Sequence, residues 1–147
     1  MSTDPESERR DFSAGGVVVD GDRMVAIVPV KRAADGSRVL GLPKGHPDGD
    51  ETAAKAATRE VLEEAGVSAR LISDLGEVEY HYERKSHRVH KVVRFFLFEY
   101  ESGDIADHDH EIERAEWIPL EDAARRLTYE GEREMVRRAM SVRTADR

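Results

Sequence analysis

The chain has 147 residues, of which 39% are hydrophobic and 37% are charged, and its formal net charge is −8. This balance is typical of one soluble globular domain, and an acidic chain has no general affinity for nucleic acid. No apolar stretch approaches the roughly 18 residues of a membrane helix, and the absence of cysteine excludes disulfides and thiolate chemistry. We therefore expect a cytoplasmic protein that does not bind membranes.

The N-terminal part of the chain predicts a tail followed by strands. Residues 1–10 lack the apolar core of a secretory signal and are expected to form a disordered tail, so that residues 11–145 form the domain. Pro29 should lie at a sheet edge or beside a bulge. A turn at Gly21–Asp22 should join the first two strands in a hairpin. The strands predicted here are Phe12–Asp20, Met24–Arg32 and Arg38–Leu42.

The rest of the chain interleaves helices and strands irregularly. A loop at Pro43–Asp50 precedes a helix rich in Ala, Leu, Glu and Lys at Glu51–Ala65, which ends before Gly66. This order predicts a single α/β domain with a mixed β-sheet and helices on both faces. The later predicted elements are the strands Val67–Tyr82, His87–Tyr100 and Glu113–Ile118, a turn at Glu83–Ser86, and the helices Pro119–Leu127 and Glu130–Val142.

Three carboxylates fall on one patch of the long predicted helix. Glu60, Glu63 and Glu64 have the i, i+3 and i+4 spacing that brings side chains together at about 100° per residue. Their charges repel, and Arg59 offsets part of this through Glu63 at i+4. A hard divalent cation such as Mg²⁺ or Mn²⁺ would offset more, because these ions prefer carboxylate oxygens. A solvated acidic face is the alternative interpretation. The small apolar residues that would face the sheet are Ala54, Ala57, Val61 and Ala65.

The surrounding segment resembles the Nudix box, G-x5-E-x7-R-E-U-x-E-E-x-G-U, in which U is aliphatic. Seven of its positions require a single residue type, so a chance match at a given start has a frequency on the order of 10⁻⁸. The resemblance implies an α/β/α sandwich and hydrolysis of a phosphoanhydride bond in substrates built on a nucleoside diphosphate. The matching residues are Gly45, Glu51, Arg59, Glu60, Val61, Glu63, Glu64, Gly66 and Val67.

The same resemblance assigns roles to individual residues. Glu60, Glu63 and Glu64 would bind the metal ion, and Gly45 would contribute its carbonyl oxygen. Arg59 and Glu51 would orient the carboxylates and the start of the helix. Members of the family often add an acidic residue six positions before a tryptophan, which is Glu111 here, although Glu111 could also be a plain surface acid. The base that accepts a proton from water would be Glu60, or else Glu111.

Residues near the box narrow the substrate. The run LPKGH resembles the start of the box in diadenosine and dinucleoside polyphosphate hydrolases, where Lys44, with His46 beside it, would contact phosphate. Tyr82 lies sixteen residues beyond Gly66, where that subgroup often stacks a base; it is equally readable as a half-buried strand residue. A basic run could hold distant phosphates or protect a sheet edge. The residues of that run considered for phosphate binding are Arg88, Lys91 and Arg94.

Other functions stay open at this point. The run ERKSHR resembles diphosphoinositol polyphosphate hydrolases, and nucleoside triphosphates, ADP-ribose, coenzyme A and the 5′ end of RNA are further candidate substrates. The intact carboxylates argue against a module that binds nucleotides without cutting them. The histidines show no zinc-binding spacing. The sequence does not separate a monomer from a homodimer.

Overall fold

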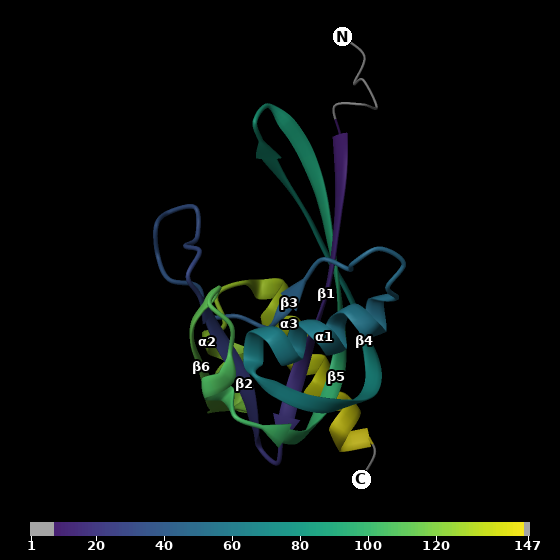
Figure 1. The fold of residues 1–147 in the computed structure, drawn as a ribbon, viewed down its shortest axis with the longest axis vertical. Coiled ribbons are helices and arrows are strands. Elements are labelled where there is room, and N and C mark those ends of the chain that lie inside the picture. Colours follow the sequence, from purple (N-terminus) through teal and green to yellow (C-terminus); the bar gives the residue numbers. More distant parts are fainter. Residues whose placement is uncertain (1–7, 146–147) are drawn as a thin grey trace.

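A mixed six-stranded β-sheet forms the centre of the computed structural model, which describes residues 8–145 (Figure 1). The strand order is β4-β5-β1-β2-β6, with β3 paired to β1 beside this path. β1 and β5 run parallel, and the other pairs are antiparallel. The strands are β1 (Glu8–Asp20), β2 (Arg23–Pro29), β3 (Lys44–Gly45), β4 (Val67–Arg84), β5 (His87–Gly103) and β6 (Ile112–Pro119).

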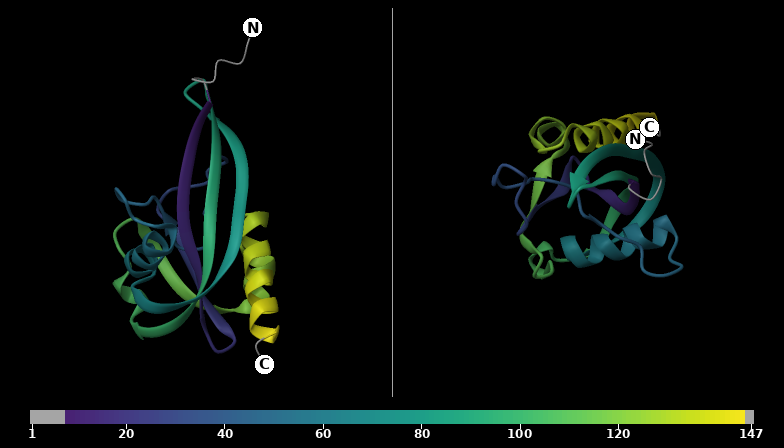
Figure 2. Two further views of the ribbon diagram at one scale, coloured as in Figure 1. Left: turned by 90° about the vertical axis from the view of Figure 1, so that its right-hand side faces the viewer. Right: turned by 90° about the horizontal axis from the view of Figure 1, so that it is seen from above.

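Helices cover both faces of this sheet, as the sequence predicts. α1 packs on one face through a core that includes Val18, Val61 and Phe98. α2 and α3 cover the other face through a core that includes Phe95 and Met135. Figure 2 shows the three layers from above. The α/β/α prediction is therefore confirmed, and none of the helices in the described part is long and apolar enough to cross a membrane. The helices are α1 (Ala53–Ala65), α2 (Leu120–Arg126), α3 (Glu130–Ala145) and a 3-10 turn, η2 (Ile105–Asp107).

The strand predicted at Arg38–Leu42 is wrong. Only Gly41 makes a bridge to β2, with Ile27 as its partner. The neighbouring backbone donors use side-chain acceptors instead: the N–H of Leu40 donates to Thr128 Oγ1 (2.8 Å) and that of Leu42 to Glu132 Oε1 (2.9 Å). These contacts replace a strand ladder and tie the segment to the turn before α3 and to the first turn of that helix. β3 forms instead within the predicted loop.

Two other predictions about the strands need adjustment and one is confirmed. Of the predicted tail, residues 1–7 lie outside the described part, whereas residues 8–10 belong to β1. The predicted turn Glu83–Ser86 is shorter, because only Lys85 and Ser86 leave the ladder, both at positive φ. Two successive residues with positive φ suit the right-handed twist of a hairpin. Pro29 lies at a register shift between β2 and β6, as expected of a proline in a strand.

The sheet continues beyond the helices as a three-stranded extension, which we call the arm. It consists of residues 8–11 of β1 and residues 80–91, which form the β4–β5 hairpin end. Figures 1 and 2 show the arm projecting beyond the layers of the domain at the end where β1 begins. The arm therefore lies beside the loop in which the box begins.

Candidate metal and substrate site

The box begins in a loop that is held by one arginine and one glutamate. Arg59 donates through Nε and Nη2 to the two carboxylate oxygens of Glu51, each at 2.9 Å. The Nη2 group also donates to the carbonyl of His46 (2.9 Å). Glu51 in turn accepts from the N–H of Asp48 (2.9 Å). These bonds lower the pKa of Glu51 to about 2, chiefly through Arg59, and they fix the path of the loop onto the helix.

α1 starts two residues later than the sequence predicts. Thr52 is its N-cap, and its hydroxyl accepts from the N–H of Lys55 (3.2 Å). Gly66 closes the helix in the left-handed conformation (φ 76°), as expected. Glu51 thus lies in the loop before the helix, where it accepts two hydrogen bonds from Arg59 of α1. These hydrogen bonds are compatible with the orienting roles predicted for Glu51 and Arg59, which stay predictions.

The box carboxylates lie in three different environments. Glu60 is 9% exposed and Glu64 is partly buried, whereas the side chain of Glu63 is 45% exposed. Burial raises the pKa of Glu60 to about 7, and Arg59 opposes this rise while Glu63 adds to it. Burial also raises the pKa of Glu64 to about 8, although Glu64 accepts a hydrogen bond from the N–H of Lys44 (2.9 Å). Two carboxylates are therefore held where their ionised forms are disfavoured.

Gly45 makes room for one of these carboxylates. A Cβ atom at this position would lie 1.6 Å from Oε2 of Glu60 and 2.2 Å from its Cδ. Such overlap forbids any larger residue unless Glu60 moves. Gly45 in β3 pairs with Ala14 in β1, and this pairing keeps the loop against the sheet at this point. The glycine of the box is thus explained by close approach of a buried glutamate.

An acidic residue of the loop after η2 reaches the same cluster. The N–H of Asp109 donates to the carbonyl of Glu63 (2.9 Å), and the charge of Asp109 helps to raise the pKa of both Glu60 and Glu64. The predicted acid, Glu111, lies two residues farther along the chain, and its side chain is exposed to solvent. Its backbone carbonyl accepts a hydrogen bond from the N–H of Val30 (2.9 Å). Asp109 is therefore nearer to the box carboxylates than the exposed side chain of Glu111, and the functional role expected of Glu111 stays a prediction.

The donor set suits a hard divalent cation. Buried carboxylates with raised pKa values gain most from a positive ion, and carboxylate oxygens are the ligands that Mg²⁺ and Mn²⁺ accept. Within residues 8–145 no three His, Cys, Asp or Glu side chains already converge as a closed metal cage.

Lys44 connects the carboxylates to a second group of side chains. Its ammonium lies 3.4 Å from Oε2 of Glu132 on α3, and both groups are largely buried. Glu132 raises the pKa of Lys44 most, and Glu64 adds to the rise. Burial raises the pKa of Tyr80, which is also influenced by Lys44, Tyr82 and Tyr129. The tyrosines Tyr80, Tyr82 and Tyr129 are 45%, 36% and 46% exposed, respectively.

The predicted substrate-binding residues separate onto two faces of the sheet. Tyr82 pairs with Val89, and Tyr80 with Lys91, so these side chains share the face on which α3 packs. Arg88 pairs with Glu83 and Arg94 with Glu77, so both arginines project from the opposite face. Arg94 is engaged there by Asp74 and by Glu77 (3.2 Å). The six predicted substrate-binding residues therefore do not form one surface.

Lys91 has a structural partner rather than a free ammonium. It is 7% exposed and donates to Asp11 Oδ2 (2.9 Å) and Ser13 Oγ (2.6 Å). The other oxygen of Asp11 lies 2.7 Å from Nε2 of His46. Asp11 thus ties the arm to the loop that opens the box. This use of His46 and Lys91 differs from the phosphate contacts expected from the sequence.

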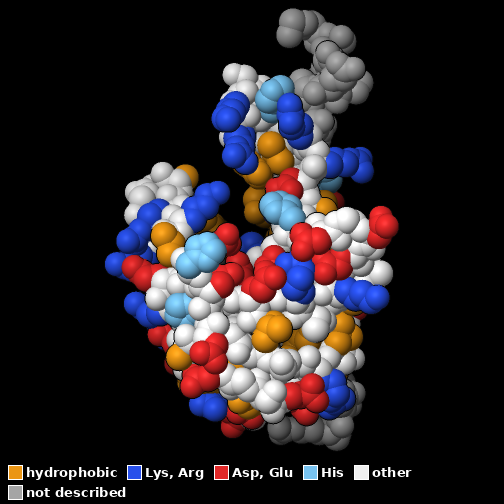
Figure 3. All heavy atoms as spheres, in the orientation of Figure 1, with side chains coloured by type: hydrophobic (Ala, Val, Ile, Leu, Met, Phe, Trp, Pro, Cys, Tyr) orange, Lys and Arg blue, Asp and Glu red, His pale blue; other side chains and the backbone are white. Residues whose placement is uncertain are grey.

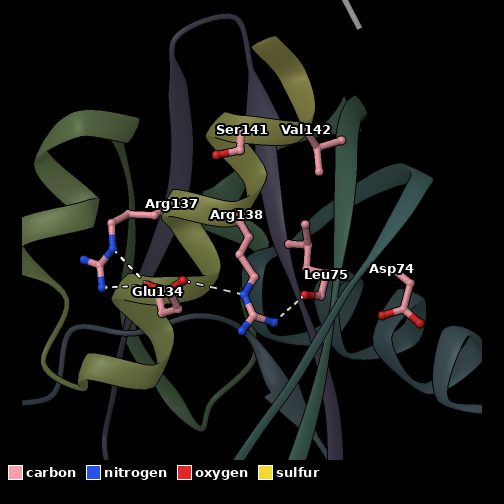
Figure 4. A pocket seen from close by; sticks show the side chains of 7 residues that line it. All are labelled: Asp74, Leu75, Glu134, Arg137, Arg138, Ser141 and Val142. Atoms are coloured by element: carbon pink, nitrogen blue, oxygen red, sulfur yellow. Dashed lines mark hydrogen bonds and ion pairs between the residues drawn. The ribbon is translucent and has the colours of Figure 1, made fainter. Parts of the chain in front are cut away.

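The surface above the carboxylates is hollowed. Figure 3 shows acidic side chains gathered over α1 and the adjacent loops, below a hollow between the arm and the loop of residues 30–40. A separate cavity of about 370 Å³ lies between α3 and β4, where Glu134, Arg138 and Leu75 line it (Figure 4). Arg138 already donates to the carbonyl of Leu75 (2.9 Å) and faces Glu134. The hollow beside the carboxylates is therefore the candidate site.

Comparison with known proteins identifies the family of the domain. The family model described as "NUDIX domain" matches residues 9–139. The chain is 36% identical over 130 residues to the putative mutator protein MutT4 of Mycobacterium tuberculosis, covering 85% of this chain and 52% of that protein. It is 34% identical over 114 residues to an 8-oxo-(d)GTP phosphatase of Mycolicibacterium smegmatis, covering 78% of this chain and 33% of that protein.

The solved structures agree on the fold. A Nudix hydrolase from Nitrosomonas europaea superposes with a TM-score of 0.73 at 21% identity, covering 91% of this chain and 90% of that one. The chain spans about half or less of the length of the two curated relatives it matches. The comparisons thus identify the domain, while the names of the longer relatives describe those proteins.

Proposed function

Because this chain belongs to the Nudix hydrolase family, we propose that it hydrolyses a phosphoanhydride bond in nucleotides with the help of Mg²⁺ or Mn²⁺. The observation that carries the proposal is the pair of buried carboxylates, Glu60 and Glu64, whose pKa values are raised to about 7 and about 8 beside the more exposed Glu63. A cation bound there would neutralise phosphate charge and lower the pKa of an attacking water. Glu60, Glu63 and Glu64 would hold it, with the carbonyl of Gly45 as a further ligand.

The protein's own groups would orient the reaction. Arg59 holds Glu63 at 3.1 Å and Glu60 at 3.6 Å, so the carboxylates keep one arrangement. A group that accepts a proton near neutral pH works best with a pKa near that pH. The base is proposed to be Glu60, whose buried side chain lies among the box carboxylates, with Glu111 as the alternative. Asp109 is a second acid within the same electrostatic environment.

Two substrate classes have separate support. Dinucleoside polyphosphates are supported by Lys44, which lies between Glu64 and the exposed tyrosines and could contact phosphate while a base stacks. Oxidised guanosine triphosphates are supported by the 34% identity to the mycolicibacterial 8-oxo-(d)GTP phosphatase. Diphosphoinositol polyphosphates have weaker support, because Arg88 and Arg94 face away from Lys44.

A panel of substrates with Mg²⁺ tests the proposal. The panel contains diadenosine tetraphosphate, 8-oxo-dGTP, GTP, ADP-ribose and a diphosphoinositol polyphosphate, and product identity shows which bond is cut. Glu63→Gln should lower metal-dependent turnover by orders of magnitude with little effect on folding, because its side chain is exposed. Glu121→Gln on α2 removes the same charge from an exposed position and serves as the matched control. Equal turnover by the two variants would contradict the assignment.

A further inference from the structure

The two residues of β3 face opposite layers of the domain. Gly45 faces α1, because a Cβ atom there would overlap the carboxylate of Glu60. Lys44 faces α3, since its ammonium lies 3.4 Å from Oε2 of Glu132 on that helix. Figure 2 shows α1 and α3 on opposite sides of the sheet. Neighbouring residues of a strand point to opposite faces, so the cation of Lys44 lies across β3 from the box carboxylates.

Glu132 is a buried carboxylate that the reaction proposed above does not use. It is 5% exposed, and both of its oxygens contact the segment that precedes the box. Oε1 accepts a hydrogen bond from the N–H of Leu42 (2.9 Å), and Oε2 faces the ammonium of Lys44. Gly41 leaves room for this side chain, because a Cβ atom there would lie 2.9 Å from Oε1. One carboxylate thus fixes both a backbone position and a side chain two residues later.

Lys44 is held at its backbone as well as at its ammonium. Its N–H donates to Oε1 of Glu64 (2.9 Å), one of the box carboxylates. The preceding carbonyl, that of Pro43, accepts from the N–H of Gly16 in β1 (3.1 Å). A lysine fixed only at its backbone would still sample many rotamers, because its stem is flexible. The contact with Glu132 restricts this freedom and leaves N–H donors of the ammonium for other acceptors.

The surroundings of the ammonium suit the phosphate of a nucleotide. The side chain of Lys44 is 29% exposed, so part of it is open to a ligand. The ammonium also lies close enough to Tyr80 to influence the pKa of that exposed ring. Lys91 shares the same face of the sheet, but its charge is already paired with Asp11. Lys44 therefore places a cation between the carboxylate site and an exposed tyrosine.

We propose that Glu132 is a positioning residue for substrate binding and that it acts through Lys44. The inference rests on the proposed function, in which Lys44 contacts a phosphate of the nucleotide. Glu132 holds the ammonium on the α3 side of β3, where it meets one phosphate, while the carboxylates hold the phosphate under attack on the α1 side. An ammonium that is ordered before binding loses less side-chain entropy when the phosphate arrives. Two phosphates of one substrate are thus held by two layers of the domain.

Glu132→Gln separates the charge from the backbone contact. The amide oxygen of Gln can still accept the N–H of Leu42, whereas the charge that faces Lys44 is lost. For the panel substrate with the highest kcat/KM, we expect KM to rise about fivefold and kcat to stay within about twofold of wild type, because an unanchored ammonium must be ordered on binding. Inorganic triphosphate, titrated calorimetrically in EDTA, should lose affinity by a similar factor without metal or turnover.

A double-mutant cycle shows whether Glu132 acts through Lys44. Lys44→Met alone should raise KM and weaken triphosphate binding at least as much as Glu132→Gln does. In the Lys44→Met background, Glu132→Gln should have no further effect on either quantity. A carboxylate that only stabilised the fold would impair binding whether or not Lys44 is present, so the two changes would add.

Two controls separate this role from general effects on charge and stability. Glu134→Gln removes the same charge from a side chain of α3 that is 45% exposed. Thr128→Val removes the hydrogen bond to Leu40, which ties the same segment to the turn before α3 without contacting the ammonium. Both should keep KM and triphosphate affinity close to wild type. If Glu132→Gln does not fold, Glu132→Asp keeps the charge but withdraws it by one methylene, and it should raise KM only when Lys44 is present.

The outcomes separate this inference from the proposed function. Equal effects of Glu132→Gln with and without Lys44, a loss confined to kcat, or an unchanged KM would overturn the positioning role while the hydrolase stands. Triphosphate binding that does not depend on Lys44 would also overturn it. Triphosphate binding that depends on both Lys44 and Glu132, in a protein that cleaves no member of the panel, would support the positioning role and contradict the proposed hydrolase.

Discussion

Replacing Glu64 by Gln should stabilise the metal-free protein at pH 8 while abolishing its activity. The carboxyl of Glu64 has its pKa raised from 4.5 to about 8, mainly by burial. At about 1.4 kcal/mol per pH unit, this rise corresponds to roughly 5 kcal/mol. Gln at this position removes the charge and can still accept the N–H of Lys44 through its amide oxygen. The variant should therefore recover several kcal/mol of folding free energy.

The sign of this effect follows from proton binding. Below pH 4.5 the carboxyl is protonated in both the folded and unfolded states, so it imposes no penalty. Between pH 4.5 and about 8 the folded protein binds a proton that the unfolded chain has released, and stability falls as the pH rises. The full penalty is reached above pH 8. Wild type and Glu64→Gln should thus have similar stability near pH 4.5 and differ most at pH 8.

Urea unfolding in EDTA at pH 4.5, 6 and 8 measures the difference directly. Adding Mg²⁺ at pH 8 should stabilise the wild type and leave the variant nearly unchanged, because the ion binds the folded site and not the unfolded chain. Turnover of a nucleotide substrate should fall by orders of magnitude in the variant. A wild type that is more stable than the variant at pH 8 in EDTA, or a stability difference that ignores pH, would refute the reasoning.

Three further changes probe other parts of the site. Gly45→Ala should lower kcat/KM on the order of 10²-fold, because the new Cβ displaces the carboxylate of Glu60 by more than 1 Å. Steady-state kinetics measures this loss. In a Glu60→Ala background, Gly45→Ala should cause no additional loss in the free energy of unfolding. Asp109→Asn should move the acidic limb of the pH–rate profile to lower pH, because it removes a charge that raises the pKa of Glu60, whereas Glu111→Gln should leave the profile in place. The reverse pattern would favour Glu111 as the functional acid. Lys44→Met should raise KM for nucleotides about tenfold and lower the free energy of unfolding by about 3 kcal/mol, since it leaves Glu132 buried without its ion pair; an unchanged urea midpoint would contradict this.

The box could be predicted from the sequence because its chemistry is local. Three glutamates at helical spacing share a face in any helix, and Gly66 marks where that helix ends. The layers of the fold were also predictable, since alternating strands and amphipathic helices determine which faces are buried. The short segment before the box was not, because its backbone donors are satisfied by Thr128 and Glu132, about 90 residues later.

The group of side chains around Lys44 could not be predicted from residue spacing along the chain. Lys44, Tyr80 and Glu132 meet only because β3, β4 and α3 converge on one face of the sheet. One signal was nevertheless present. Met135, Val136 and Ala139 follow Glu132 at i+3, i+4 and i+7, so Glu132 belongs to the buried stripe of α3. A charged residue within a buried stripe predicts a partner of opposite charge. That partner is Lys44.

The arginine of the box explains why the helix carboxylates remain available to a cation. Its guanidinium makes its two-pronged contact with Glu51, whose pKa falls to about 2. The same group lies farther from Glu60, at 3.6 Å, and the pKa of Glu60 stays near 7. Neighbouring acids whose environments separate their pKa values in this way have different roles. Glu51 is neutralised by its two hydrogen bonds from Arg59, whereas Arg59 and Lys44 offset the burial of Glu60 and Glu64 only in part, and a bound cation would offset the remainder.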